Sequence, residues 1–348
     1  MPTSNVPHNA VRDQLNRPLR DLRISVTDRC NFRCRYCMPA EIFGEKYEFL
    51  KKDQILSFEE ITRLTRIIIR LGAVKLRLTG GEPTVRQDLP RLVDQLSALD
   101  GAEDLAMTTN GVRLPLLAAD LKAAGLRRVT VSLDSLDNDV FRHMNGGKAD
   151  VSDVLAGIAA AETAGLTPIK INAVVQRGVN DHTIIDLARY CKDQGYILRF
   201  IEYMDVGNRN GWRMDEVVPA KEIVERLDQV LPLEPIARSY SSETALRYRY
   251  RDGAGEIGLI ASVTMPFCGD CSRMRLSPEG SIYTCLFATE GTDLKTPLRS
   301  GATDDQIEAI IRGTWQARTD RYSEIRTQIN ESGGDHKHEK IEMYYIGG

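Results

Sequence analysis

Six of the seven cysteines fall into two groups of three, and each group has a spacing that suits a metal centre. The first group, Cys30, Cys34 and Cys37, follows a strand-like run with the pattern C-x3-C-x2-C. Structural zinc is usually enclosed by four ligands, and no fourth cysteine or histidine lies nearby in the sequence. A four-iron, four-sulfur cluster on three cysteines keeps one iron open for a ligand. We interpret the group as such a cluster, with zinc and a distant fourth ligand as the alternative.

The second group, Cys268, Cys271 and Cys285, again has three cysteines, so a zinc knuckle or ribbon would lack its fourth ligand. Arg273 and Arg275 alternate directly after Cys271, so their side chains project to one side of an extended segment. Two guanidinium groups beside a metal centre suit an anionic ligand. The sequence therefore predicts a second open cluster next to an anion-binding site.

The remaining cysteine, Cys191, stands alone on a predicted helix, where we expect a buried apolar role. An odd number of cysteines also argues against a disulfide framework.

Strand-like and helical runs alternate along most of the chain, which is typical of a parallel sheet with crossover helices. We expect strands at Leu22–Val26, Val74–Leu78, Leu105–Thr108, Val129–Leu133, Ile169–Val175 and Ile197–Ile201. Helices are expected at Phe58–Leu71, Leu89–Leu99, Leu116–Ala124, Val151–Ala164 and Thr183–Gln194. Six such units are too few for a closed eight-unit barrel of about 250 residues. The fold class is therefore α/β, with either a doubly wound sheet or a partial barrel.

Several of these strands alternate between apolar and polar residues, although strands covered on both faces read as apolar runs. A curved sheet with a polar, cationic concave side explains the pattern. A group of cations this dense would repel unless an anion, or clusters with thiolate ligands, balanced it, and a triphosphate has about the right charge. The expected cavity cations are Arg23, Lys75, Arg77, Lys170, Arg199, Arg273 and Arg275. The phosphate-binding loop G-x4-G-K-[ST] is absent from the sequence, so side chains would have to hold the nucleotide.

The character of the chain changes after about residue 232, which suggests a division into parts. We expect the partial barrel at 15–232, a small cluster-binding module at 233–330 and a polar tail at 331–348. In the module we expect strands at Leu246–Arg251, Glu256–Ala261 and Ile282–Thr284, and a helix at Asp304–Gly313. The tail turns apolar again at 343–346 and ends in Gly347 and Gly348, so we expect it to dock and its slim tip to enter the cavity.

Composition limits the possible partners. The chain has 348 residues, and 46 Lys and Arg against 49 Asp and Glu give a net charge of −3. Nucleic acid and anionic membranes are therefore not the expected partners. No apolar run approaches the roughly 20 residues of a membrane span, and the polar N-terminus does not resemble a signal peptide. We expect a cytoplasmic protein.

The cysteine loop at 30–37 resembles the signature of the radical S-adenosylmethionine superfamily, including the aromatic Tyr36 before the third cysteine. This resemblance implies a partial (β/α)6 barrel of the TIM type. It also implies that the cofactor's methionyl amine and carboxylate bind the open iron and that its cleavage yields a 5′-deoxyadenosyl radical. The turn T-G-G-E-P at 79–83 matches the superfamily's Gly-Gly-Glu motif. The implied cofactor contacts are Tyr36, Gly81, Ser132 and Met204.

Longer segments resemble one family within this superfamily, which acts on GTP in the first step of molybdenum cofactor biosynthesis. They are R-D-L-R-I-S-V-T-D-R-C, F-I-E-Y-M-D-V-G-N and the terminal Gly-Gly, and the resemblance runs from about Arg17 to Gly348. It implies hydrogen abstraction at C3′ of GTP and closure onto C8, giving (8S)-3′,8-cyclo-7,8-dihydroguanosine 5′-triphosphate. The implied cofactors are two [4Fe-4S] clusters and S-adenosylmethionine. Gly347 and Gly348 are the implied catalytic residues.

The same resemblance implies GTP contacts and partners. The contacts are Arg23, Arg77, Thr108, Lys170, Arg273, Met274 and Arg275, to which the cation pattern adds Lys75 and Arg199. The implied partners are an electron donor and cyclic pyranopterin monophosphate synthase, which would act on the product. Both a monomer and a homodimer stay open. Two other functions also stay open: a radical enzyme that modifies a peptide, and a zinc or iron–sulfur binding module without enzymatic activity.

Overall fold

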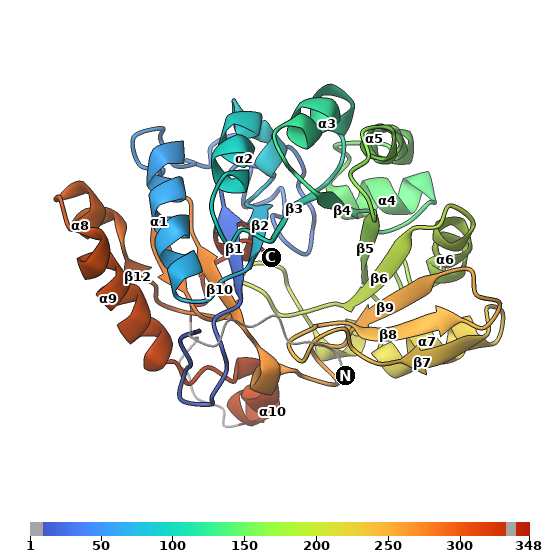
Figure 1. The fold of residues 1–348 in the computed structure, drawn as a ribbon. Coiled ribbons are helices and arrows are strands. Elements are labelled where there is room, and N and C mark those ends of the chain that lie inside the picture. Colours follow the sequence, from blue (N-terminus) through green and yellow to red (C-terminus); the bar gives the residue numbers. More distant parts are fainter. Residues whose placement is uncertain (1–9, 332–338) are drawn as a thin grey trace.

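The computed structural model describes residues 10–331 and 339–348. Within these residues the strands form a twelve-stranded sheet in the order β12-β11-β10-β1-β2-β3-β4-β5-β6-β9-β8-β7 (Figure 1). Its central strands pair in chain order and all in parallel. They are β1 (Asp21–Ser25), β2 (Lys75–Thr79), β3 (Asp104–Thr109), β4 (Arg128–Ser132), β5 (Lys170–Val175) and β6 (Ile197–Glu202). The predicted partial barrel is confirmed.

The helices of these units cover the outer face of the curved sheet (Figure 1). α1, for example, is amphipathic, and it begins with a capping box of Ser57 and Glu60. Leu22, Ile24, Leu76 and Leu78 point to this side and are fully buried. The helices are α1 (Phe58–Arg70), α2 (Leu89–Ser97), α3 (Leu114–Ala123), α4 (Asn138–Asn145), α5 (Val151–Thr163) and α6 (Ile184–Asp193). The short α4 was not predicted, although Asp137 caps its start and Phe141 and Met144 lie on one buried face.

The C-terminal part of the chain extends both edges of the sheet. On one side β10 (Arg273–Leu276) pairs in parallel with β1, followed by β11 (Ser281–Tyr283) and β12 (Thr292–Asp293). On the other side β9 (Glu256–Ile260) pairs in parallel with β6, followed by β8 (Leu246–Tyr250) and β7 (Leu233–Ile236). Residues 233–330 therefore build on the barrel sheet at both of its edges.

Short helices complete the described chain. They are α7 (Ala220–Asp228), α8 (Lys295–Arg299), α9 (Asp304–Gln316), α10 (Tyr322–Glu331) and α11 (Met343–Ile346), with 3-10 turns η1 (Pro83–Val85), η2 (Met214–Glu216) and η3 (Cys268–Asp270). The predicted tail at 331–348 lies partly outside the described residues, but its last ten residues are described, and the C-terminus lies within the curve of the sheet (Figure 1). In the described parts of the chain, no helix has both the length and the apolar character needed to cross a membrane.

Candidate active site

A cavity of about 320 Å³ lies on the concave side of the sheet. Both cysteine groups reach it, although about 230 residues separate them in the sequence. The lining includes Cys30, Cys34, Cys37, Cys268, Cys271 and Cys285. Cys191 is instead fully buried in the apolar core, as predicted. The fold therefore brings the two predicted metal-binding loops to one space.

The first cysteine loop follows β1 and is held mainly by its own backbone. The Cys37 and Met38 amides donate to the Cys34 carbonyl at 3.0 and 2.7 Å, and the Arg33 guanidinium donates to the Cys30 carbonyl at 2.8 Å. Burial raises the pKa of the Cys30 thiol to about 12, with a further contribution from Glu82. Burial also raises the pKa values of Cys34 and Cys37. These thiols need a bound cation to become thiolates at neutral pH.

The Gly-Gly turn after β2 packs against the backbone that leads into this loop. A side chain at Gly80 would meet the Thr27 carbonyl at 2.6 Å, and one at Gly81 would meet the Arg29 carbonyl at 2.3 Å. The Gly81 amide donates to the Thr27 carbonyl at 2.8 Å. Close packing of two backbone segments therefore already requires both glycines. Glu82 is buried and accepts hydrogen bonds from nearby threonines and an amide, which fixes the turn.

Arginines surround the second cysteine group. The Arg273 guanidinium donates to the Cys271 sulfur, with Nη2 at 3.2 Å. Arg17 donates to the Cys268 carbonyl at 2.8 Å and Arg318 to the Cys271 carbonyl at 2.7 Å. Burial acts to raise the pKa of Cys271, but Arg273 and Arg318 outweigh it and lower the pKa to about 6. These two arginines therefore favour the thiolate form of Cys271.

The donor sets suit iron–sulfur clusters. Each group offers three soft sulfur ligands to a shared cavity. In residues 10–331 and 339–348, no three Cys, His, Asp or Glu side chains meet closely enough to hold a single metal ion. A cubane does not require such closeness, because each cysteine binds a different iron atom.

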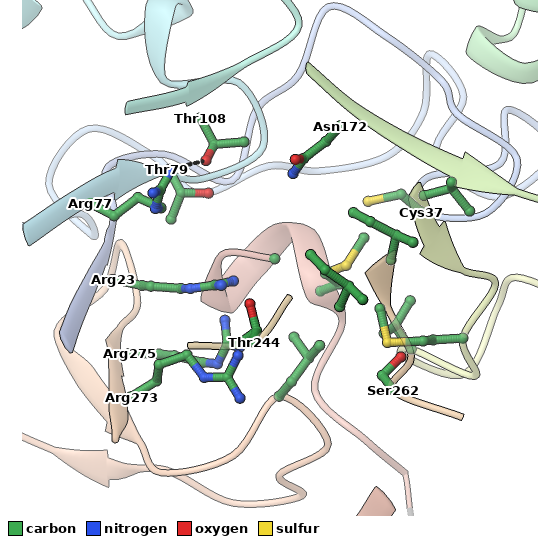
Figure 2. Close-up of a pocket in the computed structure, with 18 of the residues that line it drawn as sticks. Arg23, Cys37, Arg77, Thr79, Thr108, Asn172, Thr244, Ser262, Arg273 and Arg275 are labelled. Atoms are coloured by element: carbon green, nitrogen blue, oxygen red, sulfur yellow. Dashed lines mark hydrogen bonds between the residues drawn. The ribbon is translucent and has the colours of Figure 1, made fainter. Parts of the chain in front are cut away.

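A row of arginines faces the cavity across neighbouring strands. Arg23 of β1 pairs in register with Arg275 of β10 on one side and Arg77 of β2 on the other. Figure 2 shows Arg23, Arg273 and Arg275 close together, and Arg77 donating to Thr108 at 3.0 Å. Burial and then the three neighbouring arginines lower the pKa of Arg23 well below its usual value. Burial also lowers the pKa of Arg77 to about 10. Uncompensated positive charge of this kind favours an anionic ligand.

The C-terminal residues pack beside the first cysteine group. Tyr344 packs against Met38 and Phe43, next to Cys30 and Cys37, and its hydroxyl lies 2.6 Å from that of Tyr47.

Beyond this anchor, Ile346 is fully buried. The Gly347 carbonyl accepts a hydrogen bond from Arg275, and Gly348 lines the cavity. A side chain at Gly347 would meet the Thr79 methyl carbon at 2.3 Å. The tail therefore docks against the site, and its tip enters the cavity as expected.

Comparison with known proteins shows to which family this chain belongs. The Radical SAM superfamily matches residues 24–191, and the family Molybdenum Cofactor Synthesis C matches residues 196–324. A protein of Acidothermus cellulolyticus named GTP 3′,8-cyclase is 51% identical, covering 97% of this chain and 99% of its own. The chain belongs to the GTP 3′,8-cyclase family. Relatives of the same name from Xanthomonas campestris and Staphylococcus epidermidis are each 47% identical over 97% of this chain, covering 97% and 99% of their own lengths.

Solved structures agree on the fold alone. The peptide-bound form of SuiB from Streptococcus suis has a TM-score of 0.59 at 16% identity, covering 87% of this chain and 66% of that one. Its form bound to S-adenosylmethionine has a TM-score of 0.56 at 16% identity, covering 84% and 68%. At this identity the likeness extends to the partial barrel and not to the substrate.

Most residues predicted for this family member line the cavity. Tyr36, Gly81, Ser132 and Met204, predicted for the cofactor, all do so, as do Arg23, Lys75, Arg77, Thr108, Arg199, Arg273 and Arg275, predicted for GTP.

Two predicted substrate contacts do not belong to the lining. Met274 alternates with its arginine neighbours on β10, so its side chain is fully buried in the core on the other face of the sheet. Its side chain is therefore not available to a ligand in the cavity. Lys170, at the start of β5, lies beside the cationic lining without forming part of it. Burial and then Arg199 lower its pKa to about 7.

The sequence reasoning missed residues that support or complete the site. Asn172 of β5 lines the cavity, and its side-chain oxygen has no partner among the described residues. Asp134 accepts a hydrogen bond from the Tyr36 hydroxyl at 2.9 Å. Strand alternation from Lys170 could have identified Asn172. No pattern in the sequence indicated that Arg318 or Tyr240 lines the cavity.

Proposed function

We propose that this member of the GTP 3′,8-cyclase family binds GTP and S-adenosylmethionine in the one cavity and joins C3′ of the ribose to C8 of the base. The observation that carries the proposal is the arginine row of Arg275, Arg23 and Arg77, which faces the space reached by both cysteine groups. A relative 51% identical over nearly the whole chain is named for this reaction.

The first cysteine loop would hold a [4Fe-4S] cluster through Cys30, Cys34 and Cys37. When bound there, the cluster and S-adenosylmethionine supply a 5′-deoxyadenosyl radical that can remove a hydrogen atom. The residues proposed for cofactor contact are Tyr36, Gly81, Ser132 and Met204, which line the same cavity. Tyr36 is restrained by Asp134, and the Gly81 amide is already engaged with Thr27. This loop therefore offers the cofactor a largely preformed surface.

The arginine row would bind the triphosphate. Burial opposes the charge of each guanidinium, and the arginines also repel one another. Phosphate oxygens would relieve both effects and accept several charge-assisted hydrogen bonds. Thr108 holds Arg77 by accepting its hydrogen bond. Lys170 and the Met274 backbone, also proposed as contacts, would act from the border of the lining.

The second cysteine group would hold a further cluster through Cys268, Cys271 and Cys285. Arg273 contacts both the Cys271 sulfur and the cavity, so it would orient a ligand relative to this group. The Gly347 carbonyl on Arg275 supports a catalytic role of the Gly-Gly end in arranging the substrate. Cyclic pyranopterin monophosphate synthase would receive the product, and a separate donor would supply electrons.

The test is anaerobic incubation of reduced, iron-loaded protein with S-adenosylmethionine and each nucleoside triphosphate in turn. We expect 5′-deoxyadenosine and a cyclised nucleotide with GTP only. A matched Arg77→Met protein with unchanged iron content should lose the product. A colourless protein without iron would favour the zinc-module alternative, and 5′-deoxyadenosine formed without any nucleotide dependence would favour a different substrate, such as a peptide.

A further inference from the structure

The loop at 237–245 crosses the cavity to reach distant strands. It joins β7 to β8 at one edge of the sheet, yet its Tyr240 contacts residues at the beginnings of β1 and β2. The Lys75 ammonium donates to the Tyr240 hydroxyl at 2.7 Å, and the Arg20 guanidinium lies 4.1 Å from the centre of the ring. Because the first cysteine loop follows the end of β1, Tyr240 lies at the opposite end of the cavity.

Contacts on both sides fasten this loop. Arg238 pairs with Asp270 at 3.1 Å, next to the second cysteine group. The Ser239 hydroxyl accepts a hydrogen bond from Arg247 of β8 at 2.6 Å, and the Ser239 amide donates to Glu243 at 2.7 Å. Tyr240 is therefore held across the cavity by the sheet edge and by the cysteine segment.

The loop also presents unsatisfied polar groups to the cavity. Ser242 and Thr244 belong to the lining, and Figure 2 shows Thr244 near the arginines. The buried Ser242 hydroxyl has no hydrogen-bond partner among the described residues. Buried hydroxyls are normally paired, so this group suits a ligand that is polar where it faces the loop.

Lys75 needs an orienting partner because its side chain is long and flexible. Its nearest carboxylate, Asp21, lies 3.8 Å from the ammonium and pairs with it at longer range. The phenol of Tyr240 is a direct and neutral acceptor, so it fixes the ammonium without cancelling its charge. The remaining N–H groups of Lys75 stay available to an anion.

We infer that Tyr240 is a positioning residue for the phosphate groups of the substrate: it closes the strand-start end of the cavity and holds Lys75 toward them. This inference rests on the proposed function, since it requires a nucleotide with phosphates in the cavity. Arg20, held against the ring, keeps the tyrosine from turning into the space that the phosphates need.

The experiment compares Tyr240→Phe with the wild-type holoenzyme. The phenylalanine keeps the ring over Arg20 and removes only the acceptor of Lys75. We expect the KM for GTP to rise about three- to tenfold, the range for the net effect of losing one typical hydrogen bond, because the lost bond orients Lys75 and does not itself contact the substrate, while kcat stays within about twofold. Inhibition by inorganic triphosphate, which has no base, should weaken similarly, and guanosine affinity should not change. Tyr248→Phe, on β8 outside the lining, is the matched control.

A double-mutant cycle with Lys75→Met tests the route of the effect. In that background, Tyr240→Phe should cause no further rise in KM. An unchanged KM for the Tyr240→Phe protein, equal weakening of GTP and guanosine, or a full additional loss on Lys75→Met would each overturn the inference. Failure of the wild-type protein to bind GTP more tightly than guanosine would instead remove the proposed function itself.

Discussion

The two cysteine groups share one cavity, but Cys271 of the second group lies in different electrostatic surroundings from the three cysteines of the first. Around Cys30, Cys34 and Cys37, burial raises the thiol pKa values, and the backbone does most of the positioning. Around Cys271, guanidinium groups lower the pKa to about 6 and hold the loop carbonyls. The first group therefore depends on its metal to form thiolates. In the second group Cys271 is already matched to negative charge, whereas burial raises the pKa of Cys285 to about 11.

This difference predicts separate roles for the two cysteine groups. At the first group Arg33 donates to a loop carbonyl, and burial still keeps the thiol pKa values high, so the chemistry there is left to the metal and the cofactor. A site with Arg273 and Arg275 can hold an anionic substrate beside the sulfur ligands. The tail connects the two, since Tyr344 packs near the first group and Gly347 contacts Arg275. Substitutions near the first cysteine group and near the second should therefore affect activity in different ways.

The largest effect should come from Cys34→Ala. Two thiolates cannot hold the first cluster, so formation of 5′-deoxyadenosine should fall to background while about half of the iron remains. Iron analysis and chromatographic detection of 5′-deoxyadenosine measure both. Cys191→Ala removes a core thiol outside the cavity and should retain iron and activity. Wild-type cleavage by the Cys34→Ala protein would contradict the assignment of the first group.

Next in size is the Gly-Gly end. Removing residues 347–348 should lower turnover by about 100-fold or more, since a misplaced active-site group can cost that much, with iron content and GTP affinity largely kept. Gly347→Ala should act in the same direction, because its side chain would press on Thr79.

The matched control for this change is Gly301→Ala. Gly301 has a similar positive φ, 86° against 76° for Gly347, and has nothing within 4 Å of the added carbon. Product formation is measured for each protein. Equal activity of the two alanine variants would mean that the tail tip has no special role, and loss of iron on truncation would make its role structural.

Arg275→Ala and Arg273→Ala should have intermediate effects that differ from each other. Each should weaken GTP binding about 10- to 100-fold, as expected for a charge-assisted contact of roughly 1.5–3 kcal/mol, and guanosine binding much less. Only Arg273 contacts the Cys271 sulfur, so only its loss should also disturb the second cluster's electron paramagnetic resonance signal. Equal losses for GTP and guanosine would show that these arginines are structural.

The smallest effect should come from Tyr47→Phe. It removes the hydroxyl that meets Tyr344 at 2.6 Å but keeps the aromatic contacts, so the tail should lose about 1 kcal/mol of docking free energy. Turnover should fall less than tenfold, and protease cleavage after the tail tyrosines should become faster. Unchanged proteolysis would show that packing alone anchors the tail.

The sequence was sufficient for the six central strands, the longer helices between them and the cysteine loops, because these depend on local patterns, but it missed α4 and α7. The alternation around Arg23 and Arg77 translated directly into structure. Contacts between distant segments were not predictable. Nothing in the spacing indicated that Arg17 would hold Cys268 or that Tyr240 would reach Lys75, since these pairings arise only when the sheet curves. Met274 shows why a motif alone does not place a side chain: a motif includes residues on both faces of a strand, and the Met274 side chain lies on the core face.

The most direct test of the account uses GTP carrying deuterium at C3′. If the two cysteine groups serve one cavity, the radical produced at the first must remove the hydrogen of a nucleotide held by the arginines near the second. We expect deuterium from C3′ to appear in 5′-deoxyadenosine as cyclised GTP forms, and the label to be lost together with the product in the Cys34→Ala protein. Unlabelled 5′-deoxyadenosine alongside consumed GTP, or label arriving only from another ribose position, would contradict it.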